Sequence, residues 1–274
     1  MEIHTIYIVA NTEKPDSLRT LAVLKAWCNL RGISAIALDK ERPRRLDVEG
    51  AIAVALGGDG TVLRAASLFA DCAIPILGAN LGSLGFLTQT RAPLLTVALE
   101  GILRDEFVIE ERMRLAITIG SKKGTALNDV AVTAPAQIRF CEIELFSSDG
   151  VVATYPGDGL VISTATGSTA YSLSGGGAVI VPPMACLMAT PIATHKLGLR
   201  SVVFPSQEAL LIRAHSEVSV FVDGDFFSDL HSGGEATVEQ AKLPTRLVRM
   251  NNGPSFFKVL EEKLNWGDKS SRED

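Results

Sequence analysis

Along its first hundred residues the chain alternates between short apolar runs and stretches with helical spacing. Ile6–Ala10 is a short run rich in residues that favour strands, and the runs Ile33–Leu38 and Ala51–Leu56 predict strands that are buried on both faces. Between the first two runs, Asp16 can cap a helix and Gly32 can end it. Its apolar face is predicted to hold Leu18, Leu21, Leu24 and Trp27. A strand–helix–strand order with continuous apolar strands is typical of a parallel sheet covered by helices on both faces, so the first domain is predicted to be α/β.

The pattern changes near Phe107 to short strands in which apolar and polar residues alternate, separated by Gly, Asn, Asp and Ser turns. Such strands predict a mostly antiparallel, β-rich second domain. They are Leu115–Ile119, Glu142–Phe146, Val218–Val222 and Leu247–Met250. Helical spacing returns over Phe256–Trp266. We therefore predict an α/β domain over residues 1–104, a β-rich domain over 105–250, and a C-terminal segment over 251–274 whose helix packs on one of the domains.

Composition narrows the function classes. The chain has 274 residues, 24 of them glycine, and a net charge of −5. An acidic chain argues against a main role in coating nucleic acid or an anionic membrane. The uncharged stretch 159–194 contains glycines and prolines that prevent an apolar helix of about 20 residues. We therefore expect neither a nucleic-acid nor a membrane partner.

The four cysteines are far apart and form neither a CxxC pair nor a cluster with histidine. They are Cys28, Cys72, Cys141 and Cys186. This spacing favours neither a zinc site nor a disulfide framework, and no protein metal site is predicted. The N-terminal apolar run lacks the basic flank and cleavage pattern of a signal peptide. A reducing, cytoplasmic location is expected.

The sharpest local feature is the turn Gly57-Gly58-Asp59-Gly60-Thr61, which follows a buried strand and precedes a helical pattern. Glycines let a ligand approach the backbone, and the helix N-terminus offers N–H groups to phosphate. A carboxylate among such groups can accept a proton from an attacking hydroxyl or help to hold a divalent cation. The alternative is a tight strand-to-helix turn with an aspartate cap. Leu63 rules out the Rossmann fingerprint, and the chain has no P-loop Gly-Lys-Ser/Thr.

This turn resembles the GGDGT signature shared by NAD kinases, diacylglycerol and sphingosine kinases and, more loosely, phosphofructokinases. Two further segments resemble NAD kinases in particular: NLGSLGFLT at 80–88 and GDGLVISTATGSTAYSLSGGG at 157–177. The resemblance covers most of the chain. It implies transfer of the γ-phosphoryl group of ATP, or of polyphosphate, to the 2′-hydroxyl of the adenosine ribose of NAD, which gives NADP. It also implies Asp59 as the proton acceptor and a divalent cation such as Mg²⁺. The resemblance further implies that the β-rich domain over 105–250 binds NAD and mediates oligomerisation, in a homodimer or homotetramer with shared sites.

The nucleotide-binding candidates come from these motifs and from residues at positions where the family contacts its ligands. They are Gly57, Gly58, Gly60, Thr61, Arg64, Phe86, Asn128, Asp129, Arg139, Asp158, Thr169, Ala170, Tyr171, Ser174 and Ala193. Asn128 and Asp129 can bind a nucleoside through amide and carboxylate groups. Their alternative is an Asx turn before a strand. Arg64 can equally be a surface arginine, and Phe86 a core residue.

The sequence departs from the family pattern at three positions. Asp129 stands where the family usually has glutamate, Pro156 replaces a position that can be polar, and Asp225 stands where many relatives have glutamine. These departures leave the choice between NAD and NADH open. Two alternative functions also remain open: a lipid kinase of the same superfamily, and a nucleotide-sensing protein without catalytic activity.

Overall fold

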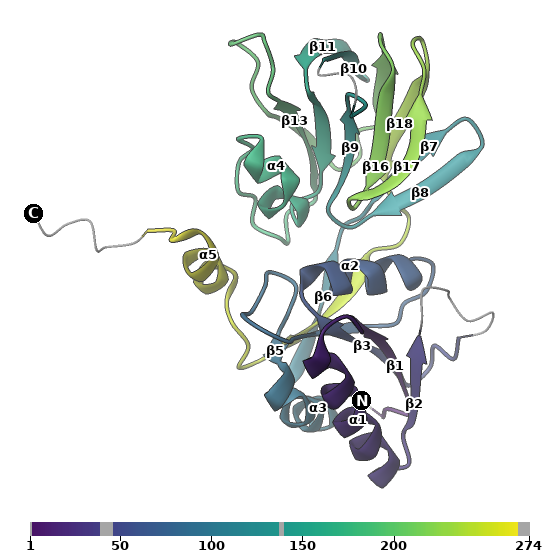
Figure 1. Ribbon diagram of the computed structural model, residues 1–274, viewed down its shortest axis with the longest axis vertical. Coiled ribbons are helices and arrows are strands. Elements are labelled where there is room, and N and C mark those ends of the chain that lie inside the picture. Colours follow the sequence, from purple (N-terminus) through teal and green to yellow (C-terminus); the bar gives the residue numbers. More distant parts are fainter. Residues whose placement is uncertain (1, 39–45, 137–139, 268–274) are drawn as a thin grey trace, which may run out of the picture. The chain divides into compact units, whose positions relative to one another are not determined.

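The computed structural model describes residues 2–38, 46–136 and 140–267. The chain forms two compact units (Figure 1). The first unit is built from Met1–Glu111 and Thr245–Asp274, and the second from Arg112–Pro244.

A seven-stranded sheet forms the centre of the first unit, in the order β2-β1-β3-β4-β19-β6, with β5 beside β4. The strand pairings from β2 to β19 are parallel, as predicted for an α/β domain. The strands are β1 (Thr5–Ala10), β2 (Ser34–Leu38), β3 (Ala51–Gly57), β4 (Ile76–Asn80), β5 (Thr90–Arg91), β6 (Phe107–Arg112) and β19 (Thr245–Met250).

Helices cover the apolar faces of this sheet. Ile6 and Ile8 of β1 pack in one core cluster with residues of α1 and α3. The alternate residue Tyr7 lies on the opposite face, where its ring centroid is 5.8 Å from that of Phe69 at the end of α2. The helices are α1 (Pro15–Leu30), α2 (Asp59–Leu68), α3 (Leu95–Leu103), α5 (Phe256–Leu264) and the short 3₁₀ helix η1 (Ala92–Leu94).

Two local expectations for this unit were wrong. Strand β2 is not buried on both faces: none of its residues is fully buried, because it is the edge strand of the sheet. Helix α1 begins at Pro15, after Lys14 at the N-cap, so Asp16 lies in its first turn instead of capping it. Leu18 is 56% exposed, whereas Leu24 and Trp27 are buried as predicted.

The sheet also includes strands that the sequence boundaries had assigned to the second domain. Strand β19 pairs in parallel with β4, with Leu247 opposite Ile76, and β6 lies beside β19. An apolar–polar alternation marks a half-buried strand but does not say which sheet the strand joins. The second unit therefore extends from 112 to 244 instead of from 105 to 250, and α5 belongs to the first unit.

The second unit consists of two six-stranded sheets whose pairings are all antiparallel, as predicted. One sheet has the order β11-β10-β15-β18-β7-β8: β7 (Leu115–Ile119), β8 (Lys122–Ala126), β10 (Cys141–Ser147), β11 (Gly150–Gly157), β15 (Leu210–Ala214) and β18 (Glu235–Gln240). The other has the order β14-β13-β12-β9-β16-β17: β9 (Asp129–Thr133), β12 (Gly159–Ser163), β13 (Cys186–Ile192), β14 (Val202–Pro205), β16 (Val218–Val222) and β17 (Asp225–Leu230).

One hydrophobic core joins these two sheets, with Ile143 and Ile212 from the first and Val132 and Leu160 from the second. The connection from β12 to β13 carries η2 (Gly167–Thr169) and α4 (Tyr171–Ser174). Over the described ranges, no helix is long and apolar enough to cross a membrane.

Candidate functional site

The glycine turn after β3 opens onto a cavity in the first unit. A Cβ at Gly57 would lie 1.9 Å from the Thr61 hydroxyl, so this position admits no side chain. Gly58 and Gly60 have open space in the direction of a Cβ. A cavity of about 390 Å³ is lined by Asn11, Glu13, Lys14, Gly58, Gly60, Thr61 and Arg64. The N-terminus of α2 thus borders a polar cavity, which suits an anionic group.

Arg64 lies at the edge of this cavity and is held in place by the neighbouring strand. Its Nη2 donates a hydrogen bond of 2.5 Å to the Ala10 carbonyl, at the end of β1. Its Nε is buried without a hydrogen-bond partner among the described residues. The guanidinium is therefore oriented by the protein instead of moving freely at the surface. With Lys14 it places two cations beside the glycine turn.

The Asp59 carboxylate is held by the loop that follows β4. Its Oδ2 accepts a hydrogen bond of 3.0 Å from the Phe86 N–H, and its Oδ1 accepts one of 3.0 Å from the Leu87 N–H. A Cβ at Gly85 would lie only 2.2 Å from Oδ1. Each carboxylate oxygen keeps a second lone pair, so a held carboxylate can still accept a proton. Asp59 is thus fixed in one orientation beside the cavity-lining glycines.

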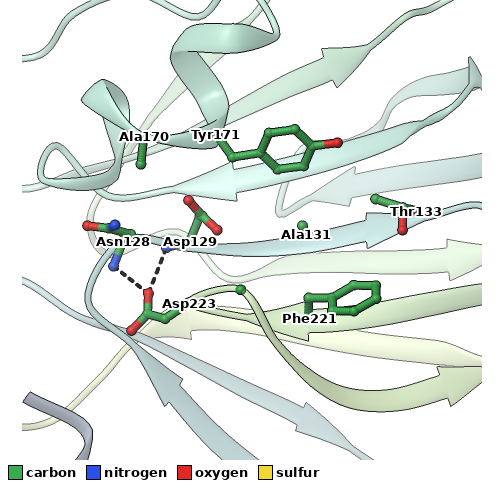
Figure 2. Close-up of a pocket in the computed structure, with 9 residues that line it drawn as sticks. Asn128, Asp129, Ala131, Thr133, Ala170, Tyr171, Phe221 and Asp223 are labelled. Carbon is green, nitrogen blue, oxygen red and sulfur yellow. Dashed lines mark hydrogen bonds between the residues drawn. The ribbon is translucent and has the colours of Figure 1, made fainter. Parts of the chain in front are cut away.

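A second cavity, of about 400 Å³, lies in the second unit (Figure 2). It is lined by Asn128, Asp129, Ala131, Thr133, Ala170, Tyr171, Phe221, Asp223 and Gly224. The rings of Tyr171 and Phe221 lie on either side of β9, and the Asp129 carboxylate points toward Ala170 and Tyr171. Two aromatic rings, small residues and a few polar groups form a pocket suited to a flat, polar-edged ring.

Asp223 holds the backbone on one side of this cavity. Its carboxylate accepts hydrogen bonds from the N–H groups of Leu127, Asn128 and Asp129, at 2.8, 2.7 and 3.2 Å. Its own N–H donates to the Asp129 carbonyl at 3.0 Å. Asp223 has a positive φ of 50°, and Gly224 follows with 87°, a turn in which aspartate and glycine are favoured. Asp223 therefore fixes the backbone of Asn128 and Asp129 through these hydrogen bonds.

Asp129 is buried, with 5% of its surface exposed, at the start of β9. Burial, and then the neighbouring Asp223 carboxylate, raise the pKa of Asp129 to about 7. Burial also raises the pKa of Asp223, although its three backbone hydrogen bonds and Arg114 oppose this rise. Perturbed carboxyl groups in a cavity are typical of functional sites.

This raised pKa predicts a pH-dependent stability. The folded chain binds a proton at Asp129 more tightly than the unfolded chain, in which the pKa of an aspartate is about 3.9. The contribution of Asp129 to the free energy of unfolding should thus be lost as the pH rises from about 4 to about 7. Asp129→Asn cannot ionise, so its stability relative to the parent chain is expected to rise over this interval. Urea unfolding midpoints at pH 5, 6, 7 and 8 measure it; a constant difference would contradict the prediction.

The other predicted residues of the second unit fall into two groups. Asn128, Asp129, Ala170 and Tyr171 line the second cavity. The remaining candidates with described positions do not line it: Asp158, Thr169, Ser174 and Ala193. Arg139 lies outside the described residues.

Close backbone packing explains the glycines around these positions. A Cβ at Gly159 would lie 2.4 Å from the Val132 carbonyl oxygen, and one at Gly157 would lie 2.8 Å from the Ala193 oxygen. A Cβ at Gly167 would lie 2.1 Å from the Asn128 oxygen. The absence of side chains lets Gly159 and Gly167 approach β9 and Asn128, and lets Gly157 approach the backbone at the end of β13.

Sequence reasoning missed residues in both cavities. In the first they are Asn11, Glu13 and Lys14, and in the second Ala131, Thr133, Phe221, Asp223 and Gly224. The Asp223-Gly224 dipeptide is a turn signal that could have drawn attention to Asp223. Nothing in the local pattern distinguishes Phe221 from the other aromatic residues of the strands.

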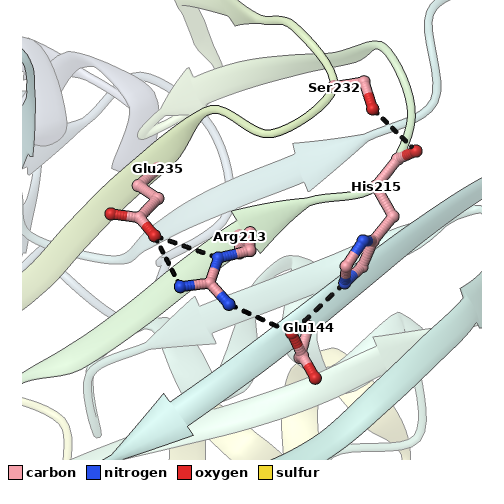
Figure 3. A network of polar contacts seen from close by, with 5 residues as sticks. All are labelled: Glu144, Arg213, His215, Ser232 and Glu235. Carbon is pink, nitrogen blue, oxygen red and sulfur yellow. Dashed lines mark hydrogen bonds and ion pairs between the residues drawn. The ribbon is translucent and has the colours of Figure 1, made fainter.

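A separate cluster of charged side chains in the second unit has a simpler interpretation (Figure 3). Arg213 lies opposite Glu144 on β10 and opposite Glu235 on β18, with N···O distances of 3.6 and 2.8 Å. His215 lies 3.2 Å from Glu144. Because these groups pair with one another across strands, they stabilise the outer face of the sheet.

The residues that the structure describes contain no group of three or more His, Cys, Asp or Glu side chains able to hold a metal ion. Mg²⁺ is commonly bound through one or two carboxylates together with the phosphates of a nucleotide. Asp59, beside the first cavity, is a carboxylate of the kind that such a shared site uses.

The chain matches two protein-family descriptions. Residues 7–107 match the ATP-NAD kinase N-terminal domain, and residues 127–250 match the ATP-NAD kinase C-terminal domain. A similar curated protein is the NAD kinase of Heliobacterium modesticaldum, which is 38% identical over 96% of this chain and 99% of that protein. Another is the NAD kinase of Moorella thermoacetica, 37% identical over 98% of this chain and 91% of that protein.

Two solved structures share the fold. The yeast NADH kinase complexed with NADH has a TM-score of 0.87 and 20% identity, over 100% of this chain and 90% of that one. The Archaeoglobus fulgidus NAD kinase in complex with ATP has a TM-score of 0.77 and 23% identity, over 95% and 98%.

Proposed function

Because this chain belongs to the NAD kinase family, we propose that it transfers the γ-phosphoryl group of ATP to the 2′-hydroxyl of the adenosine ribose of NAD, giving NADP. The observation that carries the proposal is the position of Asp59. It lies between Gly58 and Gly60, which line a polar cavity at a helix N-terminus, and two backbone N–H groups hold its carboxylate. Phosphoryl transfer requires a site that holds the phosphates and, beside it, a proton acceptor in a fixed position.

The proposed step is a direct displacement. The 2′-oxygen forms a bond to the γ-phosphorus, the bond from that phosphorus to the bridging oxygen of ADP breaks, and the hydroxyl proton passes to the Asp59 carboxylate. The Phe86 and Leu87 N–H groups orient this carboxylate, so its free lone pairs face a constant direction. Arg64 and Lys14 supply positive charge beside the phosphates.

The second cavity is proposed to bind the nucleoside of NAD. Tyr171 and Phe221 provide apolar surfaces for a ring, and Asn128 and Asp129 provide polar groups for the ring edge or the ribose hydroxyls. Asp129 is a methylene shorter than the glutamate of the family, and its raised pKa makes its charge variable near neutral pH.

Three further parts of the proposal rest on the family resemblance. Mg²⁺, bound to the phosphates of the nucleotide, would neutralise charge during transfer. A homodimer or homotetramer is proposed from the resemblance, in which Asp158 and Tyr171 reach the site of a neighbouring copy. Both residues are exposed, Tyr171 over 42% of its surface. A cytoplasmic location fits the four free cysteines.

The test is the formation of NADP by the purified chain with NAD, ATP and Mg²⁺, read by an NADP-specific dehydrogenase. We expect turnover that depends on all three additions. Parallel reactions with polyphosphate in place of ATP, and with NADH in place of NAD, identify the donor and the acceptor. No NADP under any of these conditions would contradict the kinase proposal and favour a sensing protein, whereas phosphorylation of diacylglycerol or sphingosine instead would identify a lipid kinase.

A further inference from the structure

The 81–87 loop, between β4 and β5, carries both backbone N–H groups that hold Asp59. Residues at the two ends of the loop fix part of it. The Asn80 side-chain oxygen accepts a hydrogen bond of 2.8 Å from Gly82 N–H, and the Thr88 hydroxyl accepts one of 2.7 Å from Gly85 N–H. Neither contact reaches the Phe86 side chain, which is only partly buried.

Helix α5 contacts the loop at Phe86 and Ser83. The ring centroids of Phe86 and Phe256 are 5.8 Å apart and the planes are inclined by 46°. In the last turn of the same helix, Lys263 Nζ donates a hydrogen bond of 2.9 Å to the Ser83 hydroxyl. The helix itself is anchored, because the Ser255 hydroxyl caps its N-terminus and Val259 and Leu260 are buried. A segment about 170 residues later in the chain thus contacts the loop beside the site.

We propose that α5 is a positioning element for catalysis, in which Phe256 holds the Phe86 ring and thereby keeps the Phe86 and Leu87 N–H groups aligned on the Asp59 carboxylate. The inference rests on the proposed function, because it takes Asp59 to be the proton acceptor. Phe86 is the connecting residue: its side chain contacts α5, and its own N–H donates to Oδ2 of Asp59.

Removal of the Phe256 ring is therefore expected to lower kcat, the rate of the chemical step, and to leave substrate binding unchanged. Phe256 and Lys263 are not among the residues that line either cavity, so removing the Phe256 ring takes away no cavity-lining group. It lets Phe86 move, and the two N–H donors move with it. Small displacements of a reacting group, of about 1 Å, can reduce turnover by up to about 100-fold.

Phe257 is a matched control. It is the next residue of the same helix, and its ring contacts Phe256 edge-on at a centroid distance of 5.5 Å, yet 63% of its surface is exposed. Phe257→Ala removes the same number of atoms from α5 and leaves the Phe256–Phe86 contact in place. Any general effect of weakening the helix should appear in both variants.

The experiment measures kcat and both KM values for the full chain, Phe256→Ala, Phe256→Tyr and Phe257→Ala. We expect Phe256→Ala to lower kcat by about 10-fold with KM values within about two-fold, and Phe256→Tyr, which keeps the ring, to restore most of the loss. Phe257→Ala should keep the parent kcat. If Phe256→Ala does not fold, as judged by circular dichroism at the assay temperature, Phe256→Leu is measured against the same criteria.

A double-variant test separates positioning from simple destabilisation. If Phe256 acts through Phe86, the Phe86→Ala, Phe256→Ala double variant should have a kcat no lower than that of the slower single variant. A parent-like kcat in folded Phe256→Ala, or equal losses in Phe256→Ala and Phe257→Ala, would overturn the inference. Additive losses in the double variant would overturn it too. Absence of NADP formation by the parent chain would instead overturn the proposed function.

Discussion

Replacing Asp59 with asparagine is expected to lower kcat by about 10²- to 10⁴-fold, the usual contribution of a general base. Asparagine has nearly the same shape but cannot take the proton of the attacking hydroxyl at neutral pH. In addition, both oxygens of Asp59 accept backbone N–H groups, so an amide NH₂ would place a donor against a donor on one side. The loss should therefore appear in kcat, whereas KM for ATP and NAD should change little.

The control for this variant is Asp16→Asn. Asp16 also lies in the first turn of a helix of the same unit, at the exposed start of α1. It tests whether losing an acidic group near a helix N-terminus is by itself sufficient to impair the enzyme. We expect parent-like activity in Asp16→Asn, and the melting temperature of each variant checks that it is folded at the assay temperature. Activity in Asp59→Asn within about two-fold of the parent chain would show that Asp59 is not the proton acceptor.

Replacing Gly85 with alanine is expected to reduce kcat by about 100-fold, because it displaces the Asp59 carboxylate. A Cβ at Gly85 would lie 2.2 Å from Oδ1, 2.5 Å from Cγ and 2.5 Å from Oδ2 of Asp59. The carboxylate cannot stay where it is, so it must give up its bonds to the Phe86 and Leu87 N–H groups. The measurement is steady-state kinetics for both substrates, with the melting temperature as a check on folding.

Gly82→Ala is the matched control in the same loop. A Cβ at Gly82 would have the Asn80 side-chain oxygen as its nearest neighbour, at 3.8 Å, which is an ordinary van der Waals distance. Gly82→Ala is therefore expected to keep the parent kcat and stability. If Gly85→Ala turned over as fast as Gly82→Ala, the fixed orientation of Asp59 would be unimportant for the reaction.

Asp59 and Gly85 lie against each other, but only Asp59 can be recognised as a candidate from the sequence. Asp59 was identified from the motif alone, because glycines and a carboxylate between a strand and a helix have a local chemical meaning. The close packing at Gly85 could not be predicted from the sequence, because it depends on the side chain of Asp59, 26 positions earlier in the chain. Only the packing of the 81–87 loop against the start of α2 brings the two positions together.

The same division applies to the whole protein. The sequence by itself determined several local elements, the α/β character of the first unit, the antiparallel strands of the second and the family, because these depend on periodicity and on short motifs. Tertiary structure alone decided that β19 joins the first sheet, that Asp223 clamps the Asn128–Asp129 pair and that α5 contacts Phe86. Each of these contacts joins residues about 95 to 170 positions apart, and no local pattern specifies which distant segment a strand edge, a carboxylate or a ring will meet.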